Sequence, residues 1–159
     1  MISEDVCRMK IDQYGDMIRK ICFLNLKNEA DCQDVFQNVF LKFATHESPF
    51  ESLEHEKAWL IRVTINECKN TFKSIFKKTV DIDQIRHIQS EENFGNSDLI
   101  TAVLSLPRNY KLAIYLHYYE GYTADQIGKI LNRKVNSIYS DLKRGRELLK
   151  KQLGDDFNE

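Results

Sequence analysis

Hydrophobic side chains recur every three or four positions over most of this chain, a period that predicts α-helices. In the first half, the period predicts helices over residues 4 to about 26, 29 to about 45 and 57 to about 77. Gly15 weakens the first of these as one unbroken helix, because glycine costs about 1 kcal/mol relative to alanine inside a helix. Residues 46–56 are polar, contain a proline and are predicted to form a loop.

In the second half, a short helix ending at Leu104 and a helix over residues 107–120 precede a different arrangement. Thr123 and Gln126 form a predicted capping box at the start of another short helix. A polar turn over residues 132–134 follows, and then a second, basic helix. A short helix, a tight turn and a second helix with polar side chains near its start form the helix-turn-helix geometry that reads a DNA major groove. The alternative is an ordinary helical hairpin with a solvated charged face.

The stretch between the two halves is polar and acidic and lacks a sustained apolar period, which predicts a linker. The sequence therefore predicts an all-α fold of two small helical domains joined by a flexible acidic linker. The predicted boundaries are residues 1–78 for the first domain, 79–96 for the linker, 97–153 for the second domain and 154–159 for a tail.

Charge is distributed unevenly along the chain. The net charge of the 159 residues is −1, which by itself does not suggest a nucleic-acid partner. Residues 57–78, however, carry six basic side chains and one acidic, and residues 99–153 carry ten basic and four acidic. A polyanion would feel these blocks locally, because salt screens charges beyond about 10 Å. The distribution favours DNA contacts in both predicted domains.

Motifs for catalysis, cofactors and membranes do not appear in the sequence. There is no Gly-rich phosphate loop, nucleophile elbow or metal-ligand spacing, so we expect no enzymatic activity, no cofactor and no metal. Cys7, Cys22, Cys32 and Cys68 form no Cys-x-x-Cys pair and are predicted to be reduced, as in a cytoplasmic protein. No run of about 18 apolar residues exists, so we expect no membrane insertion.

Two polar helix faces lie beside the predicted core stripes. The face on the second helix, which could dock a partner or simply meet solvent, consists of Asp34, Gln37, Asn38 and Leu41. The face on the third helix consists of Trp59, Arg62, Asn66, Lys69 and Lys73. Basic groups beside an aromatic ring suit single-stranded nucleic acid. The alternative, which we prefer for Trp59, is a core ring beside solvated cations. Phe50, in the polar loop, could fold back onto the core or stack on a base.

Three segments in a fixed order carry a further signal. The first is ADCQDVFQNVFLKF, which contains the pattern Asp-x-x-Gln-x-x-Phe at Asp34, Gln37 and Phe40. The second is KAWLIRVTINECKNTFKS. The third is LPRNYKLAIYLHYYEGYTADQIGKIL, followed by the basic helix. The first two are similar to region two, and the third to region four, of the extracytoplasmic-function group of bacterial RNA polymerase sigma factors. This resemblance covers nearly the whole chain. It implies a factor that binds core RNA polymerase and directs promoter-specific transcription initiation.

The resemblance also implies a role for each set of residues. In the family, the region two helix docks on a coiled coil of the polymerase's largest subunit, which implies polymerase contacts from Asp34, Gln37, Asn38 and Leu41. The third helix and the loop before it melt the minus-10 promoter element, which implies DNA contacts from Phe50, Glu51, Ser52, Arg62, Asn66, Lys69 and Lys73. Region four reads the minus-35 element and touches the polymerase flap, which implies DNA contacts from Arg133, Lys134, Asn136, Ser137, Tyr139, Ser140, Lys143 and Arg144. An anti-sigma factor is a further implied partner.

Four positions depart from the family pattern. Asn38 stands where glutamate is usual, and Tyr139 stands where lysine is frequent. Asp141 replaces a commonly basic residue, and a carboxylate there disfavours phosphate but could accept a hydrogen bond from a cytosine amine. Lys134 occupies the N-cap position of the basic helix, where a missing side-chain cap costs about 1 kcal/mol. The promoter sequence is therefore not transferable from relatives.

Two alternative functions are compatible with the sequence. One is a stand-alone helix-turn-helix regulator that binds duplex DNA as a dimer, and the other is a non-DNA-binding adaptor that mimics a sigma factor. A stand-alone regulator needs no melting helix and should show a dimerisation element, which we do not find in the sequence. The segments similar to region two therefore favour the sigma factor.

Overall fold

The computed structural model describes residues 2–26, 28–77 and 98–154, and every regular element in these ranges is helical. The prediction of an all-α fold is confirmed. The chain divides into two compact units, Met1–Asn93 and Phe94–Glu159. The predicted linker, residues 79–96, lies outside the described residues, as does the tail beyond residue 154. Among the described helices, none has the length and apolar character needed to cross a membrane.

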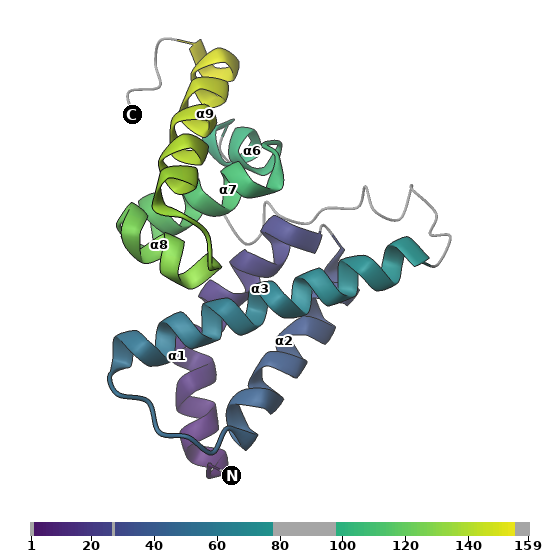
Figure 1. The fold of residues 1–159 in the computed structure, drawn as a ribbon. Helices are drawn as coiled ribbons and strands as arrows, with labels where there is room; N and C mark the ends of the chain where they lie inside the picture. The colour runs from purple at the N-terminus through teal and green to yellow at the C-terminus, as the bar shows by residue number, and fades with distance from the viewer. Residues whose placement is uncertain (1, 27, 78–97, 155–159) are drawn as a thin grey trace. The chain divides into compact units, whose positions relative to one another are not determined.

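The first unit consists of three long helices that all pack against one another (Figure 1). They are α1 (Glu4–Leu26), α2 (Glu29–Thr45) and α3 (Leu53–Lys77). Helix α1 continues through Gly15, where a Cβ atom would lie 3.4 Å from the Phe36 ring of α2, an ordinary van der Waals contact. Burial of one apolar face outweighs the helix cost of this glycine. The buried residues on this face of α1 include Ile18, Ile21 and Cys22.

Helix α3 begins four residues before the predicted start at Lys57. The predicted loop over residues 46–56 was therefore too long. The reason is a cap that the sequence analysis missed: the Ser52 hydroxyl accepts a hydrogen bond from the His55 N–H at 3.0 Å. Glu54 and Glu56 lie in the first turn, where carboxylates stabilise a helix by interacting with the positive end of its dipole. Glu56 is buried and accepts hydrogen bonds from Tyr14 and Lys10 of α1, which ties the two helices together.

The second unit packs its shorter helices around a long C-terminal one (Figure 1). The elements are α6 (Asp98–Leu104), α7 (Arg108–Ile114), η1 (Tyr115–Tyr119), α8 (Ala124–Leu131) and α9 (Val135–Leu153). The helix predicted over residues 107–120 is thus divided into an α-helix and a π-helical turn. In that turn the Glu120 N–H reaches back five residues to the Tyr115 carbonyl, at 3.3 Å.

The turn between α8 and α9 has the predicted helix-turn-helix form. The capping box is confirmed, since the Thr123 hydroxyl accepts from the Gln126 N–H at 3.2 Å and the Gln126 side chain accepts from the Thr123 N–H at 2.9 Å. Asn132 ends α8 in the left-handed conformation, with φ 54°. Asparagine tolerates this conformation better than most residues do. The chain then turns directly into α9.

Candidate nucleic-acid interface

Helix α9 separates a buried apolar face from an exposed polar one. Ile138, Leu142 and Leu149 are buried in the second unit. Six of the eight residues predicted to contact the minus-35 element are exposed, namely Lys134, Asn136, Tyr139, Ser140, Lys143 and Arg144. Tyr139 is the aromatic residue among them, with 59% of its area exposed. The first half of α9 therefore presents amide, hydroxyl and cationic groups together, which suits contacts to base edges and phosphates.

The other two predicted contact residues, Arg133 and Ser137, are half-buried. Arg133 pairs with Asp141, through its Nη1 and the carboxylate Oδ2. Asp141 is only 7% exposed. The interpretation of Asp141 as an acceptor for a cytosine amine was therefore wrong, because its carboxylate is buried and engaged by an arginine of the same protein.

The start of α9 lacks a side-chain cap, as predicted for Lys134. The Lys134 carbonyl accepts hydrogen bonds from the Ser137 and Ile138 N–H groups, at 3.0 and 3.2 Å. The N-terminus of a helix attracts anions through its dipole and its backbone donors. A lysine at this position adds a full positive charge to that attraction, so the uncapped start is suited to a phosphate.

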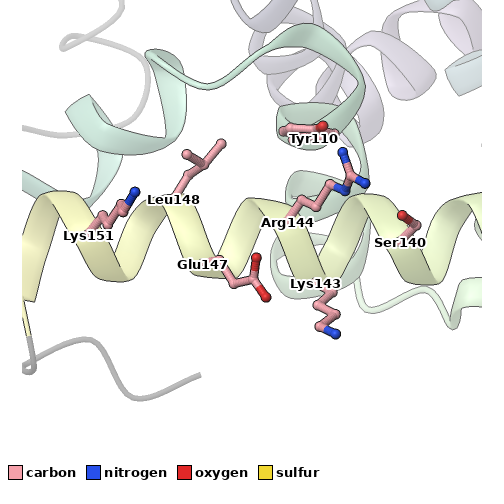
Figure 2. Close-up of a pocket in the computed structure, with 7 residues that line it drawn as sticks. All are labelled: Tyr110, Ser140, Lys143, Arg144, Glu147, Leu148 and Lys151. Atoms are coloured by element: carbon pink, nitrogen blue, oxygen red, sulfur yellow. The ribbon is translucent and has the colours of Figure 1, made fainter.

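A groove of about 610 Å³ extends along α9 beyond the predicted residues. Its lining consists of Tyr110, Ser140, Lys143, Arg144, Glu147, Leu148 and Lys151. Figure 2 shows Arg144 directed toward the ring of Tyr110, with Lys143 on the other side of the helix backbone. Sequence reasoning missed Lys151, although its spacing of seven from Arg144 places both on one helix face. Three cations and one carboxylate make the groove suitable for a polyanion backbone.

The loop before α3 is held by an aromatic cluster, made of Phe43, His46, Phe50, His55 and Trp59. The Phe50 ring lies 4.8 Å from His46, 5.5 Å from Trp59 and 6.0 Å from Phe43, measured between ring centroids. Of the two alternatives for Phe50, the structure shows the ring folded back onto the helices. Trp59 is half-buried in the same cluster. The prediction of a core role for Trp59 is thus confirmed in part.

The rest of the predicted minus-10 surface lies beside this cluster. Glu51 and Ser52 are exposed, and the Glu51 N–H donates to His55 Nδ1 at 3.1 Å. Along α3, Arg62, Asn66 and Lys69 are exposed at spacings of four and three residues, which places them on one face. The side chain of Lys73 lies outside the described residues.

Helix α2 exposes the face predicted to bind polymerase. Asp34, Gln37 and Asn38 are exposed, and Leu41 is 63% exposed. A groove of about 410 Å³ between α1 and α2 borders this face at Gln37. The face thus offers one apolar side chain and three polar ones to a partner.

Three thiols meet in the core of the first unit. Cys22 of α1 lies beside Cys32 of α2 and Cys68 of α3, and hydrogen bonding with these thiols, together with burial, raises the pKa of the Cys22 thiol. All four cysteines are free. Within the described ranges, no group of three or more Cys, His, Asp or Glu side chains is placed to hold a metal ion.

Comparison with known proteins supplies the family. The description "Sigma-70 region 2" matches residues 11–75, and "Sigma-70, region 4" matches residues 97–149. The chain is 27% identical to the ECF RNA polymerase sigma factor SigW of Bacillus subtilis, over 91% of this chain and 87% of the relative. It is 24% identical to the ECF RNA polymerase sigma factor SigE of Mycolicibacterium smegmatis, over 94% of this chain and 62% of the relative.

Solved structures share the fold. The sigma factor RpoE from Bartonella quintana, crystallised with the anti-sigma factor NepR, superposes with a TM-score of 0.72 at 18% identity, over 98% of this chain and all of that chain. CnrH, solved in complex with the cytosolic domain of CnrY, gives a TM-score of 0.62 at 17% identity, over 98% of this chain and 92% of that one. Region 2 and region 4 occur here in the family's order. The chain therefore belongs to the extracytoplasmic-function sigma factors, which direct transcription initiation by bacterial RNA polymerase.

Proposed function

We propose that this sigma factor docks on core RNA polymerase through α2 and grips promoter DNA at two places. In this proposal α9 reads the minus-35 element in the major groove. The start of α3 and the loop before it hold the melted minus-10 element. The observation that carries the proposal is the division of α9 into a buried apolar face and an exposed polar face that begins at an uncapped helix N-terminus.

The two proposed DNA surfaces differ in chemistry, as expected if α9 reads duplex DNA and α3 holds a single strand. Asn136, Tyr139 and Ser140 of α9 are short or planar polar groups suited to base edges, with Lys143 and Arg144 one turn further for phosphates. The α3 surface instead combines exposed cations with a nearby aromatic cluster. Cations that follow a backbone beside stacked rings suit a single strand.

The polymerase contact is proposed for Asp34, Gln37, Asn38 and Leu41. Their exposure on one face of α2 supports a docking role, with Leu41 as the apolar centre of a polar surface. If polymerase holds the sigma factor at the promoter, α9 does not need a high affinity for DNA of its own. Tethering to polymerase raises the effective concentration of each DNA-binding unit at the promoter.

The remaining parts of the proposal concern partners and location. We propose that an anti-sigma factor holds the protein inactive, since the similar sigma factor RpoE was solved in complex with the anti-sigma factor NepR. We also propose a cytoplasmic, non-enzymatic protein, because its proposed partners, polymerase and promoter DNA, are there. A stand-alone regulator or a sigma-mimicking adaptor is not favoured, because the chain matches both region 2 and region 4 of the Sigma-70 family and is similar to ECF sigma factors over nearly its whole length.

Selection of DNA fragments tests this proposal. Genomic fragments are incubated with core polymerase plus the protein, with the protein alone, and with core polymerase alone, and bound fragments are sequenced. The expected result is two short sequence elements at a fixed spacing, enriched only when both components are present. Enrichment of the same fragments by the protein alone would point to a stand-alone regulator. No enrichment under any condition, with no polymerase binding, would point to an adaptor.

A further inference from the structure

The pairing of Arg133 with Asp141 joins the turn of the helix-turn-helix to the body of the recognition helix. Arg133 lies in the turn before α9, and Asp141 lies almost two helical turns into α9. Their side chains are 30% and 9% exposed, respectively. A charge-assisted hydrogen bond at such low exposure is stronger than one between surface groups, and it fixes the guanidinium in place.

The backbone of Arg133 is fixed as well. Its N–H donates to the Gly128 carbonyl of α8 at 2.9 Å. Its own carbonyl lies so close to α8 that a Cβ atom at position 128 would be 2.8 Å from it, nearer than side chains approach. Gly128 therefore permits a tight turn, and the Arg133 side chain leaves that turn from one defined position. The pair with Asp141 then defines where its far end lies.

This pair lies beside a helix start that has no side-chain cap. Lys134, the next residue, makes no side-chain hydrogen bond to the first turn of α9. A capping side chain usually accepts a hydrogen bond from an N–H group of the first turn and so ties the chain to the start of the helix. Here the Arg133–Asp141 pair is a side-chain link between the turn and α9, and it neutralises the arginine charge that stands closest to Lys134 in sequence.

We propose that Asp141 is a positioning residue for promoter recognition. It holds Arg133 within the turn and away from DNA phosphates, so that α9 meets the minus-35 element in a single register beginning at Lys134. This inference rests on the proposed function of α9. It follows that loss of the Asp141 charge releases a guanidinium, which then finds phosphates on any DNA. Nonspecific affinity rises and the preference for the promoter falls.

The test uses the full chain bound to core polymerase, with a selected promoter fragment and a scrambled fragment of equal length, over a range of salt concentrations. Asp141→Asn keeps the side-chain shape and removes the charge. We expect its salt slope on scrambled DNA to be steeper by about 0.9, the value of one added phosphate contact. We expect the ratio of promoter to scrambled affinity to fall about fivefold or more, the value of one base contact.

Two further variants make the result decisive. Arg133→Gln with Asp141→Asn leaves no unpaired buried charge, so it remains testable even if the single variant folds poorly. The double variant should return to the wild-type slope while keeping the lowered ratio. Asp141→Glu, which keeps the charge, should recover most of the wild-type ratio.

Each contrary result has a separate meaning. An unchanged ratio in both asparagine variants would overturn the inference. A changed preference at a single base pair with an unchanged slope would also overturn it and make Asp141 a base reader. If the wild-type protein on polymerase shows no promoter preference, the proposed function itself fails.

Discussion

The ring of Phe50 stacks on the imidazole of His46, with centroids 4.8 Å apart and planes inclined by 15°. His46 follows the end of α2, and Phe50 lies in the loop that leads to α3. The stack thus closes the loop onto the helices that it connects. Glu51 and Ser52 are exposed and follow Phe50 directly in the chain, so the stacked ring also limits where they can lie. The aromatic cluster therefore holds in place the loop that is proposed to meet promoter DNA.

Replacing Phe50 with alanine should loosen this loop. The lost ring contacts with His46 and Trp59 are expected to cost about 2 kcal/mol of unfolding free energy. Promoter opening, measured as permanganate reactivity of minus-10 thymines, should fall by more than binding of the closed promoter does. Leu53→Ala is the control, because Leu53 is also near the loop but 65% exposed. Equal opening by the Phe50 variant and the wild type would show that the cluster has no role in melting.

Replacing Gln37 with alanine should weaken polymerase binding. A side chain near the centre of an interface commonly contributes more than 1 kcal/mol, so we expect affinity for core polymerase to fall about tenfold. Competition with a labelled sigma factor measures this affinity. Gln13→Ala is matched, since Gln13 is an exposed glutamine on α1. If both variants bind equally well, the polymerase-binding face lies elsewhere.

Replacing Arg144 with alanine should reduce the salt dependence of promoter binding. If the guanidinium contacts one phosphate, the slope of log affinity against log salt becomes shallower by about 0.9. The measurement uses holoenzyme and a promoter fragment, titrated at several salt concentrations. Arg8→Ala removes another exposed arginine, one that pairs with Glu4 on α1, and should leave the slope unchanged. A wild-type slope in the Arg144 variant would remove this residue from the DNA interface.

The Cys22 thiol should make the first unit less stable at alkaline pH. Hydrogen bonds with the Cys32 and Cys68 thiols, and burial, raise the pKa of Cys22 above its usual value of 9.0. The folded protein then keeps a proton that the unfolded chain releases. Its contribution to stability is complete below pH 9.0 and declines above it, by about 1.4 kcal/mol per pH unit.

Urea unfolding between pH 8 and pH 10.5 measures this decline. Cys22→Ala should lower stability at every pH, because it leaves a cavity, but should show a flatter dependence above pH 9. Cys7→Ala, at a half-buried position on the same helix, should retain the wild-type dependence. The same steep decline in the Cys22 variant would assign the proton release to other groups.

Local signals made much of the fold predictable. Both ends of α2 match the prediction because its apolar stripe is uninterrupted and Asn28 caps it, with its side chain accepting from the Asp31 N–H at 3.1 Å. The start of α3 was missed because Ser52 caps a first turn that is almost entirely polar. Hydrophobic period does not detect such a turn.

The candidate site was predictable where it depends on helical period and not where it depends on tertiary contacts. The exposed face of α9 follows from its 3.6-residue period. The Arg133–Asp141 pair does not, because it spans eight residues and depends on the backbone geometry of the turn. The position of Phe50 depends on rings from both α2 and α3, a tertiary contact that no local pattern encodes.

Run-off transcription tests the central claim most directly. A fragment selected by the reconstituted holoenzyme is transcribed with core polymerase alone, with core polymerase plus the protein, and with core polymerase plus the Gln37→Ala variant. We expect a discrete transcript with the wild-type protein, a weaker one with the variant and none with core polymerase alone. Tight binding of the protein to the fragment without any transcript, under conditions where a control sigma factor supports initiation, would contradict this claim.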